Sequence, residues 1–191
     1  MDKVKSASFV ARQLVRSARK GTLCANGKKN TANNGWPLGS LVTFATAWDG
    51  SPILMLSDLA EHTKNLLADK RVSLFVDGTE GFVNPQEGPR VCVIGNIDSI
   101  RNIGLEQRFL NRHPRAQMYR NFSDFDFYMI EVEQIYYIGG FARTLRIGKE
   151  KSVLCREDWR QISNSEAEIL ENMNSNHRED LLVLGTKILG A

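Results

Sequence analysis

The chain has 191 residues, 42% of them hydrophobic, and a formal net charge of +3 at pH 7. This composition can bury one full core with an appendage, and no dense basic face points to nucleic-acid binding. No apolar stretch approaches the ~20 residues that span a bilayer, and no secretory segment opens the chain. We therefore expect a soluble cytoplasmic protein with no nucleic-acid or membrane partner, whose three cysteines are reduced thiols.

The beginning of the chain predicts a helix, a short strand and a polar loop. Apolar residues at helical spacing predict a helix from residue 3 to residue 18, which ends before Gly21. Residues 22–25 predict a short strand. The turn-rich residues 26–35 show no periodicity, so we expect a solvated surface loop, although its two lysines could contact a bound anion.

Residues 35–77 predict strand, turn, strand, short helix and strand in one continuous run. The first two strands, at residues 40–47 and 53–56, show alternating apolar positions. Asp49-Gly50 between them is a strong signal for a hairpin turn. The last strand of the run is expected at residues 72–76.

The short helix that follows the hairpin carries the first candidate binding site. Asp58 is its expected N-cap, with Glu61 three residues later as in a capping box. Free N–H groups and the positive end of a helix dipole favour a bound phosphate or carboxylate. Four side chains around this helix start are candidate cofactor-binding residues: Ser57, His62, Lys64 and Asn65. The alternative is that Asp58 only caps the helix and that Lys64 is a solvated surface residue.

The middle of the chain predicts more strands and one helix. The expected strands cover residues 91–97, 127–132, 135–138 and 141–147, and the helix covers residues 105–112. Glu133-Gln134 is the expected turn between the second and third of these strands. Pro114 ends the helix, and His113 before it is expected as a surface or C-terminal cap residue. Six or so antiparallel strands with short helices favour a mainly β, closed barrel, because closure removes exposed strand edges.

The tail from Ser163 onward predicts two helices. Ser163-x-x-Glu166 and Ser165-x-x-Glu168 are overlapping helix starts, and apolar residues recur at helical spacing after them. A second helix is expected from residue 177 to residue 189. The apolar face of this segment is expected to pack on the barrel or on a partner subunit.

Four long segments together carry a family resemblance. They are GWPLGSLVTFATAWDGSPILMLSDLAEHTKNLLADKRVSLFVD, RVCVIGNI, EQRFLNRHP and FDFYMIEVEQIYYIGGFAR. The chain resembles the pyridoxamine 5'-phosphate oxidase-like FMN-binding split-barrel superfamily and, within it, the haem-utilisation (HugZ/HutZ-type) branch. The resemblance implies an antiparallel split β-barrel that forms a homodimer and binds haem or FMN in a groove between the subunits. It also implies a cofactor-binding domain at residues 1–150 and, at residues 151–191, a helical remnant of the branch's small α/β domain.

The resemblance implies roles for an arginine and two aromatic residues. Arg143 lies in GGFAR, which matches the branch's GGFGR with one glycine replaced, and is expected to bind a haem propionate or a flavin phosphate. The alternative is a salt bridge to Glu131 or Glu133. Trp36 and Phe44 could stack on a flat tetrapyrrole or isoalloxazine, and a core or dimer contact is the alternative for both.

The resemblance also bears on the choice between haem and FMN. His177 is the candidate axial ligand of haem iron, because the branch uses a histidine from the C-terminal segment; the alternative is an exposed residue. In the branch's HMNxDH junction, this chain has Asn172 and Asn176 in place of the first His and the Asp. Glu61 and His62 stand where flavin-binding oxidases carry an Arg-Lys pair. A carboxylate there disfavours tight FMN binding, because it repels a phosphate dianion.

Three functional hypotheses remain open after the sequence alone. The first is a haem-binding protein that supports oxidative haem breakdown and iron release. The alternatives are an FMN-dependent oxidoreductase and a non-enzymatic tetrapyrrole-binding module on the same fold. No catalytic residue is assigned, because the sequence has no Cys/His metal spacing, no Ser/His/Asp arrangement and no phosphate-loop motif.

Overall fold

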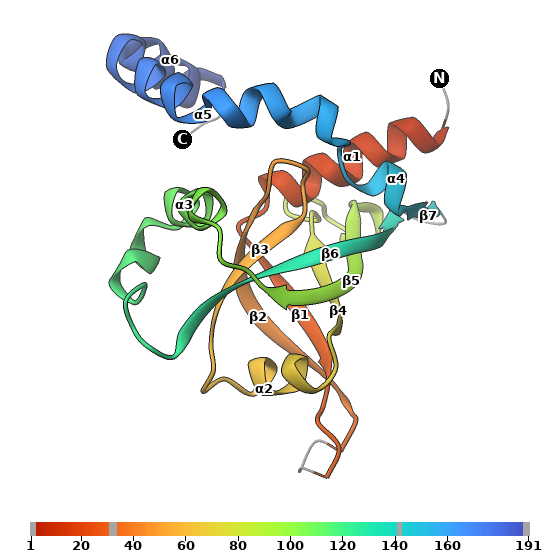
Figure 1. The fold of residues 1–191 in the computed structure, drawn as a ribbon. Helices are drawn as coiled ribbons and strands as arrows, with labels where there is room; N and C mark the ends of the chain where they lie inside the picture. Colours follow the sequence, from red (N-terminus) through yellow and green to blue (C-terminus); the bar gives the residue numbers. More distant parts are fainter. Residues whose placement is uncertain (1–2, 31–33, 141–142, 189–191) are drawn as a thin grey trace. The chain divides into compact units, whose positions relative to one another are not determined.

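The computed structural model describes residues 3–30, 34–140 and 143–188 (Figure 1). The chain divides into two compact units, Met1–Leu154 and Cys155–Ala191. Strands belong to the first unit, and the described part of the second unit is helical. None of the helices in the described ranges is long and apolar enough to cross a membrane.

The first unit alternates strands with short helices. Its elements are α1 (Lys3–Ser17), β1 (Lys20–Asn26), β2 (Pro37–Thr46), β3 (Pro52–Ser57), α2 (Glu61–Ala68), β4 (Arg71–Asp77), η1 (Pro85–Glu87), β5 (Arg90–Ser99), α3 (Ile103–Arg112), η2 (Pro114–Met118), β6 (Phe125–Ile138), β7 (Thr144–Gly148) and α4 (Lys149–Ser152). The labels η1 and η2 denote short 3-10 helices. The second unit consists of α5 (Arg156–Asn176) and α6 (Arg178–Ile188).

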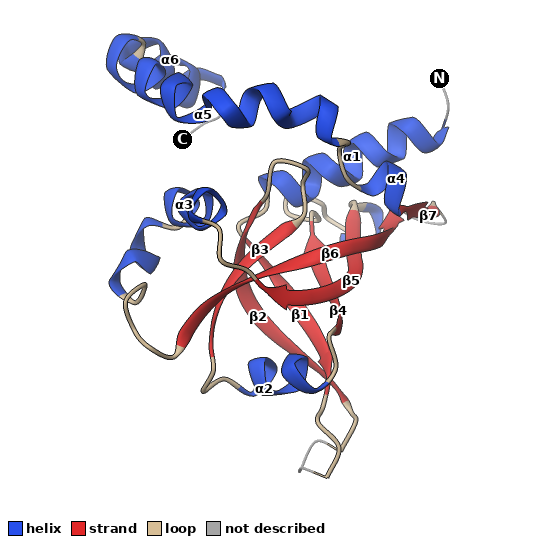
Figure 2. Ribbon diagram, in the orientation of Figure 1, coloured by secondary structure: helices blue, strands red, loops and turns tan. Residues whose placement is uncertain are grey.

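The strands form one antiparallel sheet that closes on itself (Figure 2). The order is β3-β2-β1-β4-β5-β6-β7, and an additional pairing of β3 with β6 closes the first six strands into a barrel. Strand β7 extends the sheet beyond the barrel by pairing with the end of β6. Closure gives the barrel strands neighbours on both sides. The predicted fold, a mainly β antiparallel split barrel with flanking helices, is confirmed.

Strand β6 is long enough to pair with two neighbours. Its first part pairs with β3, and most of its length pairs with β5. The pairing with β5 skips Glu133 between Gln134 and Val132, which makes Glu133 the extra residue of a β-bulge. The prediction of two strands with a turn at Glu133-Gln134 was therefore wrong. The polar pair lies in a bend of one continuous strand. The sequence pattern did not distinguish the two cases, because a bulge and a turn interrupt the alternation of apolar residues in the same way.

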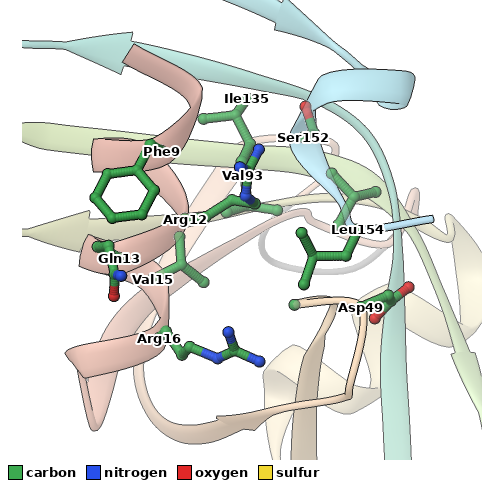
Figure 3. A pocket seen from close by; sticks show the side chains of 12 residues that line it. Phe9, Arg12, Gln13, Val15, Arg16, Asp49, Val93, Ile135, Ser152 and Leu154 are labelled. Atoms are coloured by element: carbon green, nitrogen blue, oxygen red, sulfur yellow. The ribbon is translucent and has the colours of Figure 1, made fainter. Parts of the chain in front are cut away.

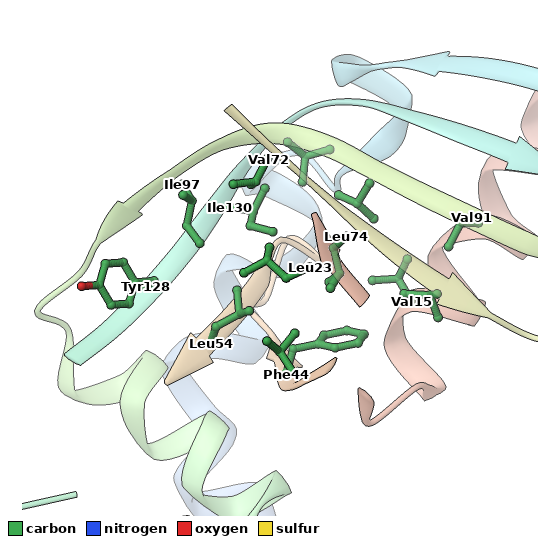
Figure 4. Packing of buried hydrophobic residues seen from close by; sticks show 14 of the residues in the cluster. Val15, Leu23, Phe44, Leu54, Val72, Leu74, Val91, Ile97, Tyr128 and Ile130 are labelled. Carbon is green, nitrogen blue, oxygen red and sulfur yellow. The ribbon is translucent and has the colours of Figure 1, made fainter. Parts of the chain in front are cut away.

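Two hydrophobic clusters lie on opposite faces of the barrel wall. In β1, β4 and β5 every second side chain is buried, as expected when one face of a strand meets a core. Leu23, Phe44 and Leu74 are fully buried members of the interior cluster (Figure 4). The second cluster packs α3 on the outer face of β2, β3 and β6, where Phe109 meets Phe127 edge-on at 5.7 Å between ring centroids.

Turn chemistry and the two end helices complete the barrel. Asp49-Gly50 joins β2 to β3 as predicted, with Gly50 at φ +98°. The amide and the hydroxyl of Ser51 both donate to the Asp49 carboxylate at 2.9 Å. Helix α1 lies at one end of the barrel and α2 at the other (Figure 1).

The first helix of the second unit begins in a different place from the one predicted. Helix α5 starts at Arg156, so Ser163 and Ser165 lie inside it and not at its cap. The hydroxyl of Ser163 donates to the carbonyl of Arg160 at 2.9 Å. The hydroxyl of a serine inside a helix can donate to a backbone carbonyl of the preceding turn. A serine in the sequence can therefore belong either to the start of a helix or to its interior. The predicted second helix is confirmed as α6.

The bulge makes Gly95 sensitive to substitution. A Cβ at Gly95 would overlap the carbonyl oxygen of Glu131 on β6. Gly95→Ala should therefore lower the free energy of unfolding by about 2 to 4 kcal/mol, measured by urea unfolding. Gly148→Ala is the control, because the described chain leaves open space beside its added Cβ. Equal stability of the two variants would contradict this geometry.

Candidate functional site

The connection from β3 to α2 holds the residues predicted as an anion site. Helix α2 begins at Glu61 with Ala60 as its N-cap, and no described side chain caps it. The predicted N-cap at Asp58 was therefore wrong. A separate turn precedes the helix, in which the amide of Ala60 donates to the carbonyl of Ser57 at 3.0 Å. The Ser57 hydroxyl accepts from the amide of Leu59 at 3.2 Å and so stabilises this turn in place of a capped helix start.

Ser57 and Asp58 are bonded to the segment that begins β6. Ser57 Oγ donates to Asp124 Oδ2 at 2.6 Å, and the Asp58 amide donates to the Asp124 carbonyl at 2.7 Å. The Tyr128 hydroxyl donates to Asp58 Oδ1 over a long 3.5 Å. Burial, together with the negative charge of Asp58, raises the pKa of Tyr128 to about 12. The proton of the Ser57 hydroxyl is thus already engaged within the chain.

The polar residues of α2 point in different directions. Lys64 is exposed, whereas Thr63 and Asn65 are 0% exposed. Asn65 Oδ1 accepts from the Lys28 amide at 3.0 Å, which fastens the β1–β2 loop to the helix. His62 is half-buried, and this burial lowers its pKa. Because successive helical residues are about 100° apart, the predicted residues do not converge on one point.

Adjacent residues on α2 give a test of this orientation. Asn65→Ala should lower the free energy of unfolding by about 1 to 3 kcal/mol, because it leaves the Lys28 amide without its acceptor inside the protein. Lys64→Ala is the control and should change it by less than about 0.5 kcal/mol. Urea unfolding measures both variants. A Lys64→Ala variant as unstable as Asn65→Ala would contradict the assignment of buried and exposed faces.

Tyr128 makes the stability fall at high pH. Its pKa is about 12 in the folded chain and about 10 when unfolded, so the unfolded state loses the proton first as the pH rises. The stability that Tyr128 contributes below about pH 10 is therefore lost between about pH 10 and about pH 12. Between about pH 9 and about pH 11, the free energy of unfolding should fall more for the wild type than for Tyr128→Phe. Parallel declines would show that another group is responsible.

The two predicted stacking residues occupy different environments. Phe44 is fully buried in the barrel interior, so the alternative of a core residue describes it (Figure 4). Trp36 is 74% exposed immediately before β2, and its carbonyl accepts from the Gly27 amide at 2.8 Å. Stacking of Trp36 on a ligand or on a second subunit stays a prediction.

Arg143 lies in the turn between β6 and β7. Its amide donates to the Gly140 carbonyl at 3.2 Å, and its side chain is exposed. The carboxylates considered as its alternative partners, Glu131 and Glu133, pair with Lys149 at 2.7 and 3.3 Å. Binding of a propionate or phosphate by Arg143 stays a prediction.

The predicted site residues on β3, on α2 and near β7 cannot meet within one chain. Ser57 pairs with Phe125 at the start of β6. Thr144, next to Arg143, pairs with Ile138 at the end of the same strand. The 14 residues of β6 span roughly 40 Å at about 3.3 Å per residue. A pocket that uses both ends needs two copies of the chain, and the predicted homodimer, which stays a prediction, would supply them.

His177 belongs to the second unit, where it is the C-cap of α5. Its ring is exposed, and Nδ1 lies 3.6 Å from Asp180 Oδ2. Its role as a haem ligand stays a prediction. Within the described ranges, no group of three or more His, Cys, Asp or Glu side chains could hold a metal ion.

A small cavity lies beside α1 (Figure 3). Its volume is about 120 Å³, and Arg12 and Arg16 of α1 line it together with Asp49 of the β2–β3 turn. Arg12 Nη1 donates to the Lys151 carbonyl at 2.7 Å, which ties α1 to α4. Cofactor pockets usually measure about 300 to 1,000 Å³. This cavity is therefore too small for haem or a flavin.

An open hollow of about 550 Å³ lies over β1, β4 and β5. Cys24, Ser73 and Cys92 line it together with residues of both charge signs, Arg71 and Glu133. Burial raises the pKa of the Cys92 thiol, which keeps it protonated and weakly nucleophilic. The mixed charge gives this hollow no preference for an anionic ligand.

A third hollow, which we call the basic groove, lies between the start of β1, the strands β2 and β3, and α3 with η2. Its volume is about 500 Å³, and its basic residues are Arg19, Lys20, Arg112, His113 and Arg115. None of the described residues that line it is acidic. Met55, Phe109 and Tyr119 supply apolar surface. Cations beside apolar walls suit a flat organic anion.

Two arginines connect the basic groove to the end of α1. Arg112 Nη2 donates to the Ser17 carbonyl at 2.5 Å, where the negative end of the helix dipole favours a cation. Arg19 Nη2 donates to the Arg112 carbonyl at 3.0 Å. Burial, and then the charge of Arg19, lower the pKa of Arg112. Within the described residues, the side chains of Lys20 and Arg115 have no hydrogen bond or ion pair.

His113 ends α3, as expected, and also lines the basic groove. Its Nε2 lies 2.8 Å from the Phe44 carbonyl oxygen, and its ring packs on Phe109 with 4.9 Å between centroids. Burial lowers the pKa of His113; the bond to Phe44 opposes this, and the charges of Arg19 and Arg112 add to it. The ring is therefore a neutral imidazole at pH 7.

Comparison with known families agrees with this architecture. Residues 2–153 match the family model described as CREG, beta-barrel. The chain belongs to the CREG β-barrel family. The assignment covers nearly all of the first unit and confirms the resemblance to pyridoxamine 5'-phosphate oxidase-like split barrels.

Proteins similar to this family member include two with haem in their names. The chain is 30% identical over 188 residues to the chloroplastic non-canonical heme oxygenase HOZ of Arabidopsis thaliana, covering 92% of the chain and 56% of that protein. A heme binding protein from Mycobacterium smegmatis has a solved structure with a TM-score of 0.70 and 27% identity, covering 76% of the chain and 59% of that structure. The chain thus spans little more than half the length of both proteins.

A more distant structure shares the fold. HutZ, the heme storage protein of Vibrio cholerae, superimposes with a TM-score of 0.58 and 16% identity, over 72% of the chain and 99% of that structure. At this identity the likeness concerns the fold alone.

Sequence reasoning missed the basic groove. It considered His113 only as a surface or cap residue and gave Arg112 no role. The available signal was the cluster Arg-His-Pro-Arg at residues 112–115 and the pair Arg19-Lys20. Arg19 and Arg112 are 93 residues apart in the chain, so only the folded barrel brings them together.

Proposed function

We propose that this chain binds haem and supports its oxidative opening, with release of iron. The observation that carries the proposal is the 30% identity to a plant non-canonical heme oxygenase over 92% of the chain. The heme binding protein of M. smegmatis, at 27% identity, supports the same ligand. Haem binding and ring opening are both proposed for this chain, because it spans only part of the length of each relative.

The chemistry of the chain's donors suits haem. A bare metal ion needs several ligands, and the described residues hold no cluster of His, Cys, Asp or Glu for one. Haem iron needs a single axial side chain from the protein, and the chain has three histidines. Haem carboxylates need cations that are not already neutralised, and Lys20 and Arg115 have no carboxylate partner among the described residues.

FMN is less well matched to this chain. By the family resemblance, Glu61 and His62 stand where flavin-binding oxidases of the superfamily carry an Arg-Lys pair. Glu61 lies in the first turn of α2 and is exposed. A phosphate dianion next to this carboxylate would be repelled, and the repulsion grows as the effective dielectric constant falls.

The chain and its ligand would divide the work. Bound haem supplies the redox chemistry that activates dioxygen and opens the ring. The protein would hold the carboxylates with its cations, keep one imidazole at the iron and cover the macrocycle with apolar side chains. A homodimer remains part of the proposal, as the family resemblance implies, and a pocket shared by Arg143 and α2 between two copies is the alternative site for haem.

Titration with ferric haem tests the proposal. We expect a shifted, saturable Soret band, whereas the same protein titrated with FMN should leave the flavin spectrum and fluorescence unchanged. Hen egg-white lysozyme, which has no haem site, controls at equal concentration for unspecific haem binding. An unchanged haem spectrum, or tight FMN binding without haem binding, would contradict the proposal.

Turnover separates an enzyme from a carrier. In the presence of ascorbate and dioxygen, the Soret band of the complex should decay, and an iron chelator in the solution should capture the released iron. A Soret band that persists under these conditions would contradict the enzymatic part and support a haem carrier.

A further inference from the structure

We propose that the basic groove is the haem-binding site, with His113 Nδ1 as the axial ligand of the iron and the surrounding cations as partners of the two propionates. This inference rests on the proposed function. It assigns the iron to a different histidine from His177, which the sequence resemblance implied.

The hydrogen bond of His113 determines which ring nitrogen can bind a metal. A carbonyl oxygen only accepts hydrogen bonds, so the Nε2 that lies 2.8 Å from the Phe44 oxygen carries the proton. Nδ1 keeps its lone pair, and no hydrogen bond to it is made within the described residues. Metal-binding histidines commonly have this arrangement, in which one nitrogen donates to a backbone carbonyl and the other binds the metal.

The acceptor for His113 is itself rigidly held. The Phe44 side chain is fully buried in the barrel interior, and its amide donates to the Arg19 carbonyl at 3.2 Å. Two consequences follow for the groove. The imidazole is fixed to a central strand, and the same strand residue holds the backbone of Arg19, whose side chain lines the groove.

The positive charge of the groove has no counter-charge in its described lining. Arg19 and Arg112 donate to backbone carbonyls, which fixes their side chains but leaves their charge unneutralised. Lys20 and Arg115 have no partner among the described residues, so both can turn toward a ligand. Two carboxylates on one ligand can each take an arginine or lysine partner here.

Apart from Thr43, the other residues that line the groove are apolar, and the groove has a suitable volume. Met55 and Phe109 are buried members of the cluster under α3, and Tyr119 stacks on Phe125 with 5.3 Å between centroids. The groove measures about 500 Å³. That volume lies within the range of about 300 to 1,000 Å³ usual for cofactor sites.

The other two histidines lack this combination. His62 lies on α2, next to the exposed carboxylate of Glu61 and outside the hollows described above. His177 is exposed, and its Nδ1 faces the carboxylate of Asp180 at 3.6 Å. Among the residues that the structure describes, neither ring donates a hydrogen bond to a backbone carbonyl.

Four histidine variants of the full chain test the axial ligand. His113→Gln keeps an N–H donor for the Phe44 carbonyl, and circular dichroism confirms its folding. We expect His113→Gln to shift the ferric Soret maximum and the electron paramagnetic resonance signal, and to weaken haem binding by about tenfold or more. His62→Ala and His177→Ala, which represent the rival assignments, should match the wild type. Added imidazole should restore the wild-type spectrum in His113→Ala.

A double variant that removes two positive charges tests the propionate contacts. Lys20→Ala/Arg115→Ala should weaken haem binding by about tenfold or more, because two charge-assisted contacts are lost. Haem dimethyl ester, whose carboxylates are blocked, should bind this variant and the wild type equally. Arg101→Ala/Lys187→Ala removes the same charge from exposed positions outside the groove and should leave haem affinity unchanged.

The outcomes separate this inference from the proposed function. Wild-type protein that does not bind haem would overturn both. Haem binding with an identical spectrum in wild type and His113→Gln, or a spectral change in His177→Ala or His62→Ala instead, would overturn the groove assignment and leave the proposed function standing.

Discussion

The pairing of β6 with both β5 and β3 holds the molecule together. The bulge at Glu133 bends β6, so that its first part meets β3 and the sheet closes. Closure gives β2 and β3 an inner face, which buries Phe44, and an outer face, on which α3 packs. The outer packing in turn brings His113 to the Phe44 carbonyl and Arg112 to the end of α1. The basic groove therefore depends on barrel closure.

Magnitudes favour a ligand over a purely structural explanation of the groove. Surface pairs such as Lys149 with Glu131 contribute about 0 to 1 kcal/mol, so the chain gains little from neutralising exposed cations. Like charges 4 Å apart repel by about 1 kcal/mol in water and by about 4 kcal/mol near a protein surface. Arg19, Lys20, Arg112 and Arg115 line one groove whose described residues include no acid. A dianion bound there would relieve this repulsion, and apolar walls would strengthen the attraction by excluding water.

Local patterns predicted much of the fold, and long-range contacts account for the errors. Asp49-Gly50 identified its hairpin, because turn chemistry acts within a few residues. Glu133-Gln134 suggested a turn, since only the pairing with β5 distinguishes a bulge from a strand end. Asp58 suggested an N-cap, but its carboxylate and amide bond to Tyr128 and Asp124. His113 shows the same limit for the site: its cap role is local, whereas its Phe44 partner is 69 residues away in the chain.

The most direct test is a crystal structure of the full chain with ferric haem bound. The account predicts iron coordinated by His113 Nδ1, with Nε2 still donating to the Phe44 carbonyl and the propionates against Lys20 and Arg115. Iron bound by His177, or haem seated beside Arg143 between two copies of the chain, would contradict it.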